Sequence, residues 1–272
     1  MRGIILYHAG CWDGLLAAYL INGWHFKDTA TCIPVSYGQP VPVEAWSADC
    51  DVFIVDFSYS RDVLDELKAQ SNSLTVLDHH KTAKDELYGC SYATFDMTKC
   101  GARLAADYIL LAEKIDVEHH QMKELIDYVE DRDLWKWELA GSKAVNAFIR
   151  SFPLTFESIK NMMGTLVEPG RLIGEAILRS VNQSVEVMID RGLIMGFDGV
   201  KTIPVVNATV HNSEVGHRLL ELYPNANFSV TWFRRADRKT QYELRARGDF
   251  DCSAVAKAHG GGGHPRAAGY VE

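Results

Sequence analysis

The stretch Leu74-Thr75-Val76-Leu77-Asp78-His79-His80-Lys81 decides the fold. An apolar, β-branched run ends abruptly at an acid and two adjacent histidines. This pattern predicts a buried strand that delivers polar side chains at its carboxyl end, where open parallel sheets place their sites. Because neighbouring strand residues point to opposite sides, His79 and His80 can take different roles, one toward a metal and one toward a substrate. An ordinary hydrogen-bonded loop is the alternative.

Two other predicted strands also end in polar side chains. Strand 4–7 runs into a turn that contains His8, Cys11 and Asp13, and an apolar helix follows over 15–21. Strand 52–55 ends at Asp56. Further elements are expected at 31–36 (strand) and 61–69 (helix), which together predict an α/β fold with a doubly wound, mostly parallel sheet. The carboxyl ends of parallel strands meet at one edge, so these side chains are expected to converge on a metal site.

Two helices are predicted next, over 100–114 and 117–129, and the second leads into Glu130-Asp131-Arg132-Asp133. An acid at a helix C-terminus is disfavoured by the helix dipole, so Asp131 is a candidate for a functional role. A solvated Asp131 paired with Arg132 is the alternative. His119 and His120 are interpreted as surface residues, because no third ligand is near them in the sequence.

The C-terminal part of the chain has a different character. A long helical pattern over 170–189, with a stop near Gly192, predicts a connector. Strands at 203–206, 228–235 and 241–247 and a helix at 213–222 then predict a smaller α/β domain. The expected division is therefore 1–169, a connector at 170–192, and 193–272.

Candidate anion ligands lie near the end of this second part. Four consecutive glycines cost chain entropy and are tolerated where the backbone approaches a ligand or presents several N–H groups to an anion. A flexible tail is the alternative. Arg245 and Arg247 alternate on one predicted strand face and can address one phosphate, although two solvated arginines are equally consistent with the spacing. The predicted anion-binding residues are Arg245, Arg247, Gly261, Gly262, Gly263, His264 and Arg266.

Composition indicates a globular protein with a small-molecule partner. The net charge is −8, and residues 193–272 hold 10 Lys and Arg against 8 Asp and Glu, whereas residues 1–192 hold 18 against 28. Duplex DNA binders show a broad basic face, which this pattern does not predict. No apolar run approaches the ~18 residues of a membrane span. The six cysteines lack paired spacing, which favours reduced thiols and a cytoplasmic location.

The ordered motifs resemble those of the DHH phosphoesterase superfamily along the whole chain. His8-x-x-Cys11-x-Asp13-Gly14, Asp56, and Asp78-His79-His80 resemble its first three motifs. Asp131 in Glu-Asp-Arg-Asp-Leu-Trp resembles the fourth. The segment Gly261-Gly262-Gly263-His264-Pro265-Arg266-Ala267-Ala268-Gly269 resembles the glycine loop of the DHH-associated C-terminal domain, and it and the third motif are the specific parts.

The resemblance implies two divalent cations, usually manganese. His8 and the first-motif residue would hold one cation, and Asp13, His79 and Asp131 the other, with Asp56 bridging both. His80 would face the scissile phosphate, and Asp78 would orient the histidines. Asp133 is the rival of Asp131 as a ligand.

The chain departs from the family pattern at Cys11, which stands about where a second aspartate is common. A thiolate ligand would shift preference toward zinc or iron. Alternatively, Cys11 is a small apolar filler and one metal site is weak.

The resulting hypothesis is a metal-dependent phosphodiesterase that hydrolyses short oligonucleotides or (cyclic) dinucleotides to mononucleotides. Two alternatives stay open: a phosphomonoesterase acting on nucleotide bisphosphates, and a nucleotide-binding sensor with weakened catalysis. Neither duplex DNA nor a membrane is an expected partner. The sequence leaves the oligomeric state open, a homodimer included.

Overall fold

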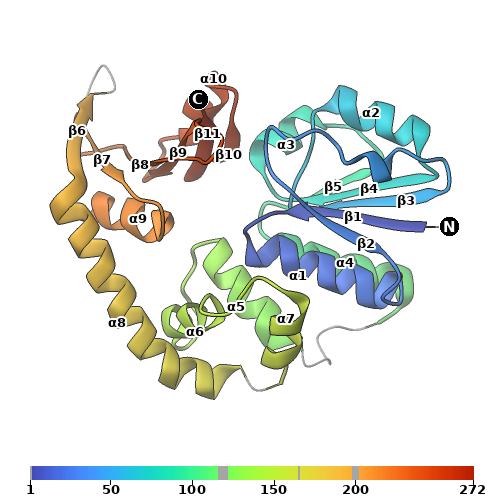
Figure 1. The fold of residues 1–272 in the computed structure, drawn as a ribbon, viewed down its shortest axis with the longest axis horizontal. Helices are drawn as coiled ribbons and strands as arrows, with labels where there is room; N and C mark the ends of the chain where they lie inside the picture. The colour runs from blue at the N-terminus through green and yellow to red at the C-terminus, as the bar shows by residue number, and fades with distance from the viewer. Residues whose placement is uncertain (1, 116–121, 165, 198–201) are drawn as a thin grey trace. The chain divides into compact units, whose positions relative to one another are not determined.

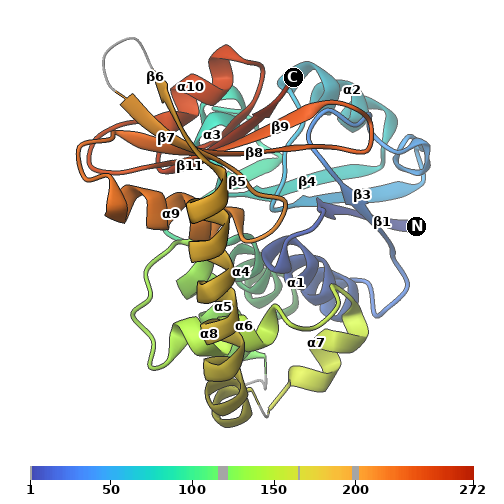
Figure 2. The ribbon, with the colours of Figure 1, turned by 60° about the vertical axis from the view of Figure 1, so that its left-hand side comes forward.

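The computed structural model describes residues 2–115, 122–164, 166–197 and 202–272. The chain forms two compact units, Met1–Leu178 and Arg179–Glu272. Their boundary falls within α8 (Val167–Gly192), which Figure 2 shows as one continuous helix. The α/β class and the smaller α/β second part are confirmed, while the predicted three-part division with a connector at 170–192 stays a prediction. No described helix has both the length and the apolar character needed to cross a membrane.

A parallel sheet organises the first unit. Its described strands have the order β2-β1-β3-β4-β5, and every neighbouring pair is parallel. The strands are β1 (Arg2–His8), β2 (Thr31–Val35), β3 (Cys50–Val55), β4 (Ser73–Asp78) and β5 (Ala93–Phe95), of which β5 was not expected from the sequence. The order reverses between β1 and β3, and such a switch point is where open α/β sheets bind ligands at their carboxyl ends.

Helices cover both faces of this sheet, with α1 and α4 on one face and α2 and α3 on the other (Figure 1). Their bounds are α1 (Trp12–Leu20), α2 (Arg61–Gln70), α3 (Lys81–Glu86) and α4 (Gly101–Glu113). Alternation along β3 places Phe53 and Val55 in the α1–α4 core and Val52 and Ile54 in the core beneath α2. Because both faces are buried, β3 carries a continuous apolar run from Val52 to Val55.

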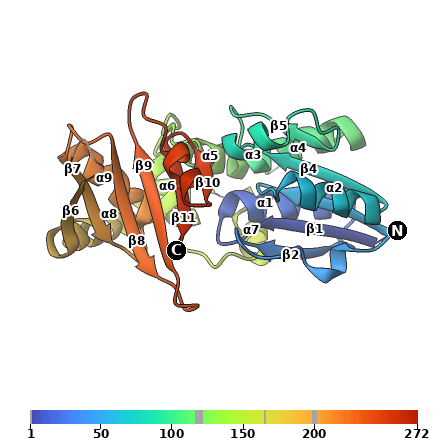
Figure 3. The ribbon, with the colours of Figure 1, turned by 90° about the horizontal axis from the view of Figure 1, so that it is seen from above.

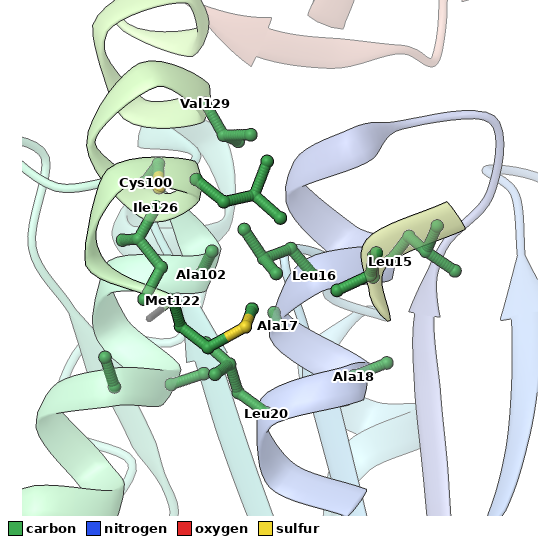
Figure 4. Packing of buried hydrophobic residues seen from close by; sticks show 14 of the residues in the cluster. Leu15, Leu16, Ala17, Ala18, Leu20, Cys100, Ala102, Met122, Ile126 and Val129 are labelled. Atoms are coloured by element: carbon green, nitrogen blue, oxygen red, sulfur yellow. The ribbon is translucent and has the colours of Figure 1, made fainter. Parts of the chain in front are cut away.

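Three further helices follow α4, namely α5 (Lys123–Asp133), α6 (Ser142–Ile149) and α7 (Phe156–Met162). The predicted end of the helix over 117–129 is wrong, because α5 continues to Asp133. The predicted beginning, together with His119 and His120, lies outside the described residues. Ile126 and Val129 of α5 pack with Leu16 of α1 and Ala102 of α4 in the core shown in Figure 4. This packing fixes the C-terminal end of α5 relative to the sheet.

A mixed sheet organises the second unit, with the order β10-β11-β9-β8-β7-β6 in its described part. Only the β7–β8 pair is parallel. Figure 3 shows the antiparallel β8 and β9 side by side. The elements are β6 (Leu193–Phe197), β7 (Thr202–Asn207), α9 (Asn212–Leu222), β8 (Phe228–Arg234), β9 (Thr240–Ala246), α10 (Cys252–Ala258), β10 (Gly262–His264) and β11 (Ala267–Val271).

Candidate metal centre

The switch point of the first sheet places His8 and Asp56 at neighbouring strand ends. His8 is the last residue of β1, and Asp56 directly follows β3. Asp56 has φ +54°, in the left-handed region that aspartate tolerates better than most residues. Such a conformation costs on the order of 1–3 kcal/mol and persists only where the surroundings enforce it. The Asp56 N–H donates to the carbonyl of Leu77, which anchors this turn to β4.

The Asp56 carboxylate lies between two histidines. Its Oδ1 is 3.1 Å from Nε2 of His79, and its Oδ2 is 3.5 Å from Nδ1 of His8. Oδ2 is buried and accepts no hydrogen bond from any described residue. One carboxylate is therefore shared between histidines from two different strands, with a buried oxygen available to a cation.

Two groups of potential ligands meet at this carboxylate. In each group, one ligand atom per residue lies within 4.8 Å of the others: His8, Cys11 and Asp56 form the first, and Asp13, His79 and Asp133 form the second. Nε2 of His79 is 3.6 Å from Asp13 Oδ2 and 3.5 Å from Asp133 Oδ2. Carboxylate and imidazole are suitable ligands for divalent cations such as Mn²⁺ or Zn²⁺. The donor set thus fits two cations, with Asp56 close to both.

The N-terminus of α4 holds Asp13 in place. Its carboxylate accepts hydrogen bonds from the backbone N–H of Gly101 at 2.6 Å and of Ala102 at 2.7 Å. The helix dipole favours a negative charge there. A methyl group on Gly101 would lie 2.6 Å from Cβ of Asp56, so only glycine allows this approach. Nothing in the local sequence around Gly101 indicated this contact.

A second carboxylate, Asp78, positions the adjacent histidine. Its Oδ1 lies 2.7 Å from Nδ1 of His80 and accepts a hydrogen bond from the backbone N–H of His79 at 2.7 Å. Its Oδ2 accepts a hydrogen bond from the hydroxyl of Ser58, also at 2.7 Å. Asp78 is fully buried. The arrangement matches an orienting carboxylate, and Ser58, which the sequence did not single out, holds that carboxylate.

The structure brings Asp133, not Asp131, to His79. The Asp131 carboxylate instead accepts hydrogen bonds from the backbone N–H of Glu138 at 2.8 Å and of Leu139 at 3.4 Å. Its own carbonyl also accepts from Lys136 N–H at 2.8 Å. Asp131 therefore fastens the loop that follows α5, and this geometry corrects its expected placement at the metal centre. The sequence pointed to both acids, and only the continuation of α5 to Asp133 distinguishes them.

The closely spaced carboxylates and histidines of the centre shift one another's pKa values. Burial would lower the pKa of His79, but its hydrogen bond with Asp56 and the charge of Asp133 raise it well above its usual value. Burial would raise the pKa of Asp56, but contacts with two histidines hold it well below. The pKa values of Asp13 and Asp133 are raised by desolvation and by the charge of Asp56. Desolvation and the same carboxylates raise the pKa of the Cys11 thiol. A bound cation would relieve this repulsion.

The predicted anion-binding arginines of the second unit have intramolecular partners. Arg245 donates to the Ser213 hydroxyl at 2.7 Å and lies 3.5 Å from the carboxylate of Glu243. Arg247 lies beyond the end of β9 and donates to the carbonyls of Leu220 and Pro224 at the end of α9. Both side chains reach α9, which agrees with the expected shared face, but their donors are engaged by groups of the same unit. Anion binding by these two arginines stays a prediction.

The glycine segment forms a hairpin with β11. A methyl group on Gly261 would lie 2.1 Å from the Gly269 carbonyl oxygen, and one on Gly263 would lie 2.6 Å from that of Ala267. Close strand packing thus accounts for two of the glycines without a ligand. Gly262 and His264 belong to β10, and Arg266 is exposed in the turn before β11. His264 and Arg266 stay candidates for anion binding.

No family model matches the chain. The chain is 25% identical over 299 residues to uncharacterized protein R106 of Acanthamoeba polyphaga mimivirus, which covers 98% of this chain and 66% of that protein. It is 23% identical over 239 residues to oligoribonuclease NrnB of Bacillus subtilis, which covers 80% of this chain and 58% of that protein. The chain therefore spans about two thirds or less of the length of these relatives.

Two solved structures with the DHH fold resemble the chain along its whole length. RecJ of Thermus thermophilus, in complex with Mn²⁺, has a TM-score of 0.58 at 13% identity and covers 99% of this chain and 49% of its own. The pGpG-specific phosphodiesterase PggH of Vibrio cholerae has a TM-score of 0.52 at 13% identity, and the match covers 100% of this chain and 93% of the PggH chain. This likeness confirms the fold that the motifs predicted.

Proposed function

We propose that this chain, which belongs to the DHH phosphoesterase superfamily by its motifs and fold, is a metal-dependent phosphodiesterase that hydrolyses short oligonucleotides or (cyclic) dinucleotides to mononucleotides. The observation that carries the proposal is the shared Asp56 carboxylate, which lies 3.1 Å from His79 and 3.5 Å from His8. A carboxylate that reaches both ligand groups could hold two cations at the separation of roughly 3.5–4 Å that suits phosphate ester hydrolysis.

In the proposed centre, His8, Cys11 and Asp56 would hold one divalent cation, and Asp13, His79, Asp133 and the shared Asp56 would hold the other. Asp133 takes the ligand role first expected of Asp131. When bound, such cations lower the pKa of water and neutralise charge on phosphoryl oxygens. Manganese is the expected metal, and zinc or iron would be favoured if the Cys11 thiolate is a ligand.

His80 is the proposed substrate contact among the catalytic residues. Because Asp78 accepts the hydrogen bond from Nδ1 of His80, Nε2 is the nitrogen that would face the substrate phosphate, and only the imidazolium form would donate a hydrogen bond from it. Because the Ser58 hydroxyl and a backbone N–H also hold Asp78, the imidazole is fixed before substrate arrives. This pre-orientation would lower the entropic cost of reaching the transition state.

The substrate class rests on the named relatives. NrnB is an oligoribonuclease and PggH acts on pGpG, and both names point to short nucleotides. We assign substrate selection to the second unit, where Arg266 is exposed and His264 is its near neighbour. Linear and cyclic dinucleotides are both candidates. We still predict a cytoplasmic location and no binding of duplex DNA. A homodimer stays one of the possible oligomeric states.

The test combines metal content with product analysis. Purified protein is analysed for metals and then incubated, in each detected metal, with a linear dinucleotide, a cyclic dinucleotide and a nucleotide 3′,5′-bisphosphate. We expect close to two metals per chain and mononucleotide products. Asp56→Asn should reduce turnover by more than about 100-fold. Removal of a residue that only hydrogen-bonds a metal ligand costs about 10- to 100-fold, and loss of a ligand should cost more. Asp62→Asn, on the exposed side of α2, is the matched control. Cleavage of the bisphosphate alone would replace the diesterase by a monoesterase.

A nucleotide-binding protein without turnover is the second candidate, and Cys11 is the observation that favours it. The thiol stands in the first ligand group, about where the family commonly has an aspartate, and if it is only an apolar filler, His8 and the shared Asp56 are the remaining members of that group. One metal or none per chain, with a dinucleotide bound but uncut, would establish this alternative.

A further inference from the structure

We propose that Tyr37 is a positioning residue whose ring stacks on a nucleobase adjacent to the scissile phosphate. The inference rests on the proposed function and adds a base contact to it. Tyr37 belongs to none of the sequence motifs. It lies in the loop after β2, the strand next to β1, where Val35 is paired with His8.

A rigid turn presents the tyrosine. The backbone N–H of Gln39 donates to the Ser36 carbonyl at 3.1 Å, and the Gln39 side-chain oxygen accepts from the Ser36 N–H at 2.9 Å. Tyr37 therefore occupies the second position of a four-residue turn. Gly38 follows with φ +84°, the conformation that a type II turn requires at its third position. The two reciprocal hydrogen bonds hold the ring at the corner of the turn.

The ring of Tyr37 lies beside both histidines that border the centre. Its centroid is 5.8 Å from that of His8 and 6.3 Å from that of His80, with interplanar angles of 70° and 82°. On another side it packs against Phe57, at 4.6 Å. Phe57 is 1% exposed, and it directly follows Asp56. The tyrosine is thus supported by the same segment that carries the shared carboxylate.

Despite this support, 45% of Tyr37 remains exposed. A single exposed aromatic residue is ordinary on a protein surface. Tyr37 differs from such a residue because its ring contacts two histidines of the site. Its π surface therefore borders the place where a phosphate would bind. Aromatic side chains stack on nucleobases of any identity and contribute roughly 1–3 kcal/mol per base. The Tyr37 hydroxyl could donate a hydrogen bond to a phosphate oxygen, whereas the exposed ring face suits a base. Tyr37→Phe separates these two contacts, because it keeps the ring and removes the donor.

The alternative is that Tyr37 only shields His8 from water, and two substitutions separate these roles. Tyr37→Phe keeps the ring, whereas Tyr37→Leu keeps apolar bulk and removes the π surface. Tyr88→Leu, at an 82% exposed site in the same unit, is the control. Kinetics are measured on a dinucleotide and on the same phosphodiester without bases. We expect Tyr37→Leu to raise KM for the dinucleotide about tenfold, equivalent to about 1.4 kcal/mol, and to leave the baseless substrate unchanged. Tyr37→Phe and Tyr88→Leu should match the wild type.

The outcomes distinguish the two proposals. An unchanged KM for the dinucleotide in Tyr37→Leu, or an equal loss of kcat on both substrates, would overturn the stacking role while the phosphodiesterase stands. If the wild type binds a dinucleotide without cutting it, the proposed reaction fails, and the dissociation constants of the same variants decide the role of Tyr37. A wild type that binds no nucleotide would remove both proposals.

Discussion

Oδ2 of Asp133 lies 3.5 Å from Nε2 of His79, at the meeting point of α5 and β4. Asp131, two residues earlier, contacts the backbone of Glu138 and Leu139 instead. We therefore expect substitution of Asp133 to lower metal affinity and substitution of Asp131 to lower stability. Asp133→Asn should weaken Mn²⁺ binding by at least about tenfold, since even supporting partners of metal ligands contribute that much.

Asp131→Ala should retain metal affinity and lose stability. It removes the acceptor of the Glu138 and Leu139 N–H groups, and the loss of such a hydrogen bond costs roughly 0.5–1.5 kcal/mol. For a chain of this size each kcal/mol corresponds to about 2–4 °C in Tm. Calorimetric Mn²⁺ titration and thermal unfolding of both variants check the prediction. Loss of metal in Asp131→Ala with an unchanged Tm would reverse our assignment.

Gly101→Ala should damage both folding and the metal centre. The added methyl group would lie 2.6 Å from Cβ of Asp56 and 3.0 Å from Oδ2 of Asp13. Over-packing of this kind costs typically 1–3 kcal/mol, and here the atoms that must move are the ligands themselves. Gly23→Ala is the matched control, because the nearest atom to its methyl group, Oδ1 of Asp28, is 3.9 Å away. A Gly101→Ala variant with normal Tm and metal affinity would contradict the geometry of this contact.

The ligands that lie at the carboxyl ends of strands could be predicted from the sequence. His8, Asp56 and His79 each stand where an apolar run stops, and parallel strands gather such positions at one edge. Asp133 could not be chosen over Asp131 in this way, because sequence patterns locate helix ends only to within a few residues. Gly101 carries no local signal, since its constraint comes from Asp56, far away in the sequence.

The second unit shows the same limit for hydrogen bonds. The sequence predicted Arg247 to be a phosphate ligand, whereas in the structure its side chain donates to the carbonyls of Leu220 and Pro224. The sequence predicted Gly261 and Gly263 to belong to a ligand-binding loop, whereas in the structure close packing against β11 already requires glycine at both positions. Each partner lies in another element, and the residue pattern around each position contains no information about it.

The two arginines should therefore behave differently on substitution. Arg247→Ala removes the donor that satisfies carbonyls at the end of α9, which should lower Tm and leave KM nearly unchanged. Arg266→Ala should raise KM with little change in Tm, because its side chain is exposed in a hairpin turn. Thermal unfolding and dinucleotide kinetics on both variants check this. A higher KM in Arg247→Ala at an unaltered Tm would restore the original expectation for Arg247.

His217 should make the second unit sensitive to acid. Burial lowers its pKa to about 4, and its Nδ1 lies 2.8 Å from the Ser213 carbonyl. Because the folded pKa is below the unfolded value of about 6.5, the unfolded state binds more protons between these two values. The stabilising preference for neutral His217 is thus complete above about pH 6.5 and is lost as the pH falls toward about 4, by at most roughly 3 kcal/mol.

Chemical unfolding of the wild type and His217→Gln at pH 7 and pH 5 isolates this contribution from that of other acids. The wild type should lose more stability than the variant between the two pH values. Parallel losses would show that His217 does not carry the effect.

Cys11→Asp should move the metal preference toward manganese. Cys11 lies in the first ligand group with His8 and Asp56, and its thiolate is softer than a carboxylate. The position precedes α1 with extended backbone angles and makes no side-chain capping bond. Aspartate is among the preferred residues at such an N-cap. A further carboxylate beside Asp13, Asp56 and Asp133 adds repulsion in the metal-free protein, so we expect the stability of the variant to depend on bound metal. We expect higher Mn²⁺ and lower Zn²⁺ affinity than in the wild type, measured by competition titration. Cys11→Ala should weaken both metals, and equal affinities in all three proteins would mean that residue 11 is not a ligand.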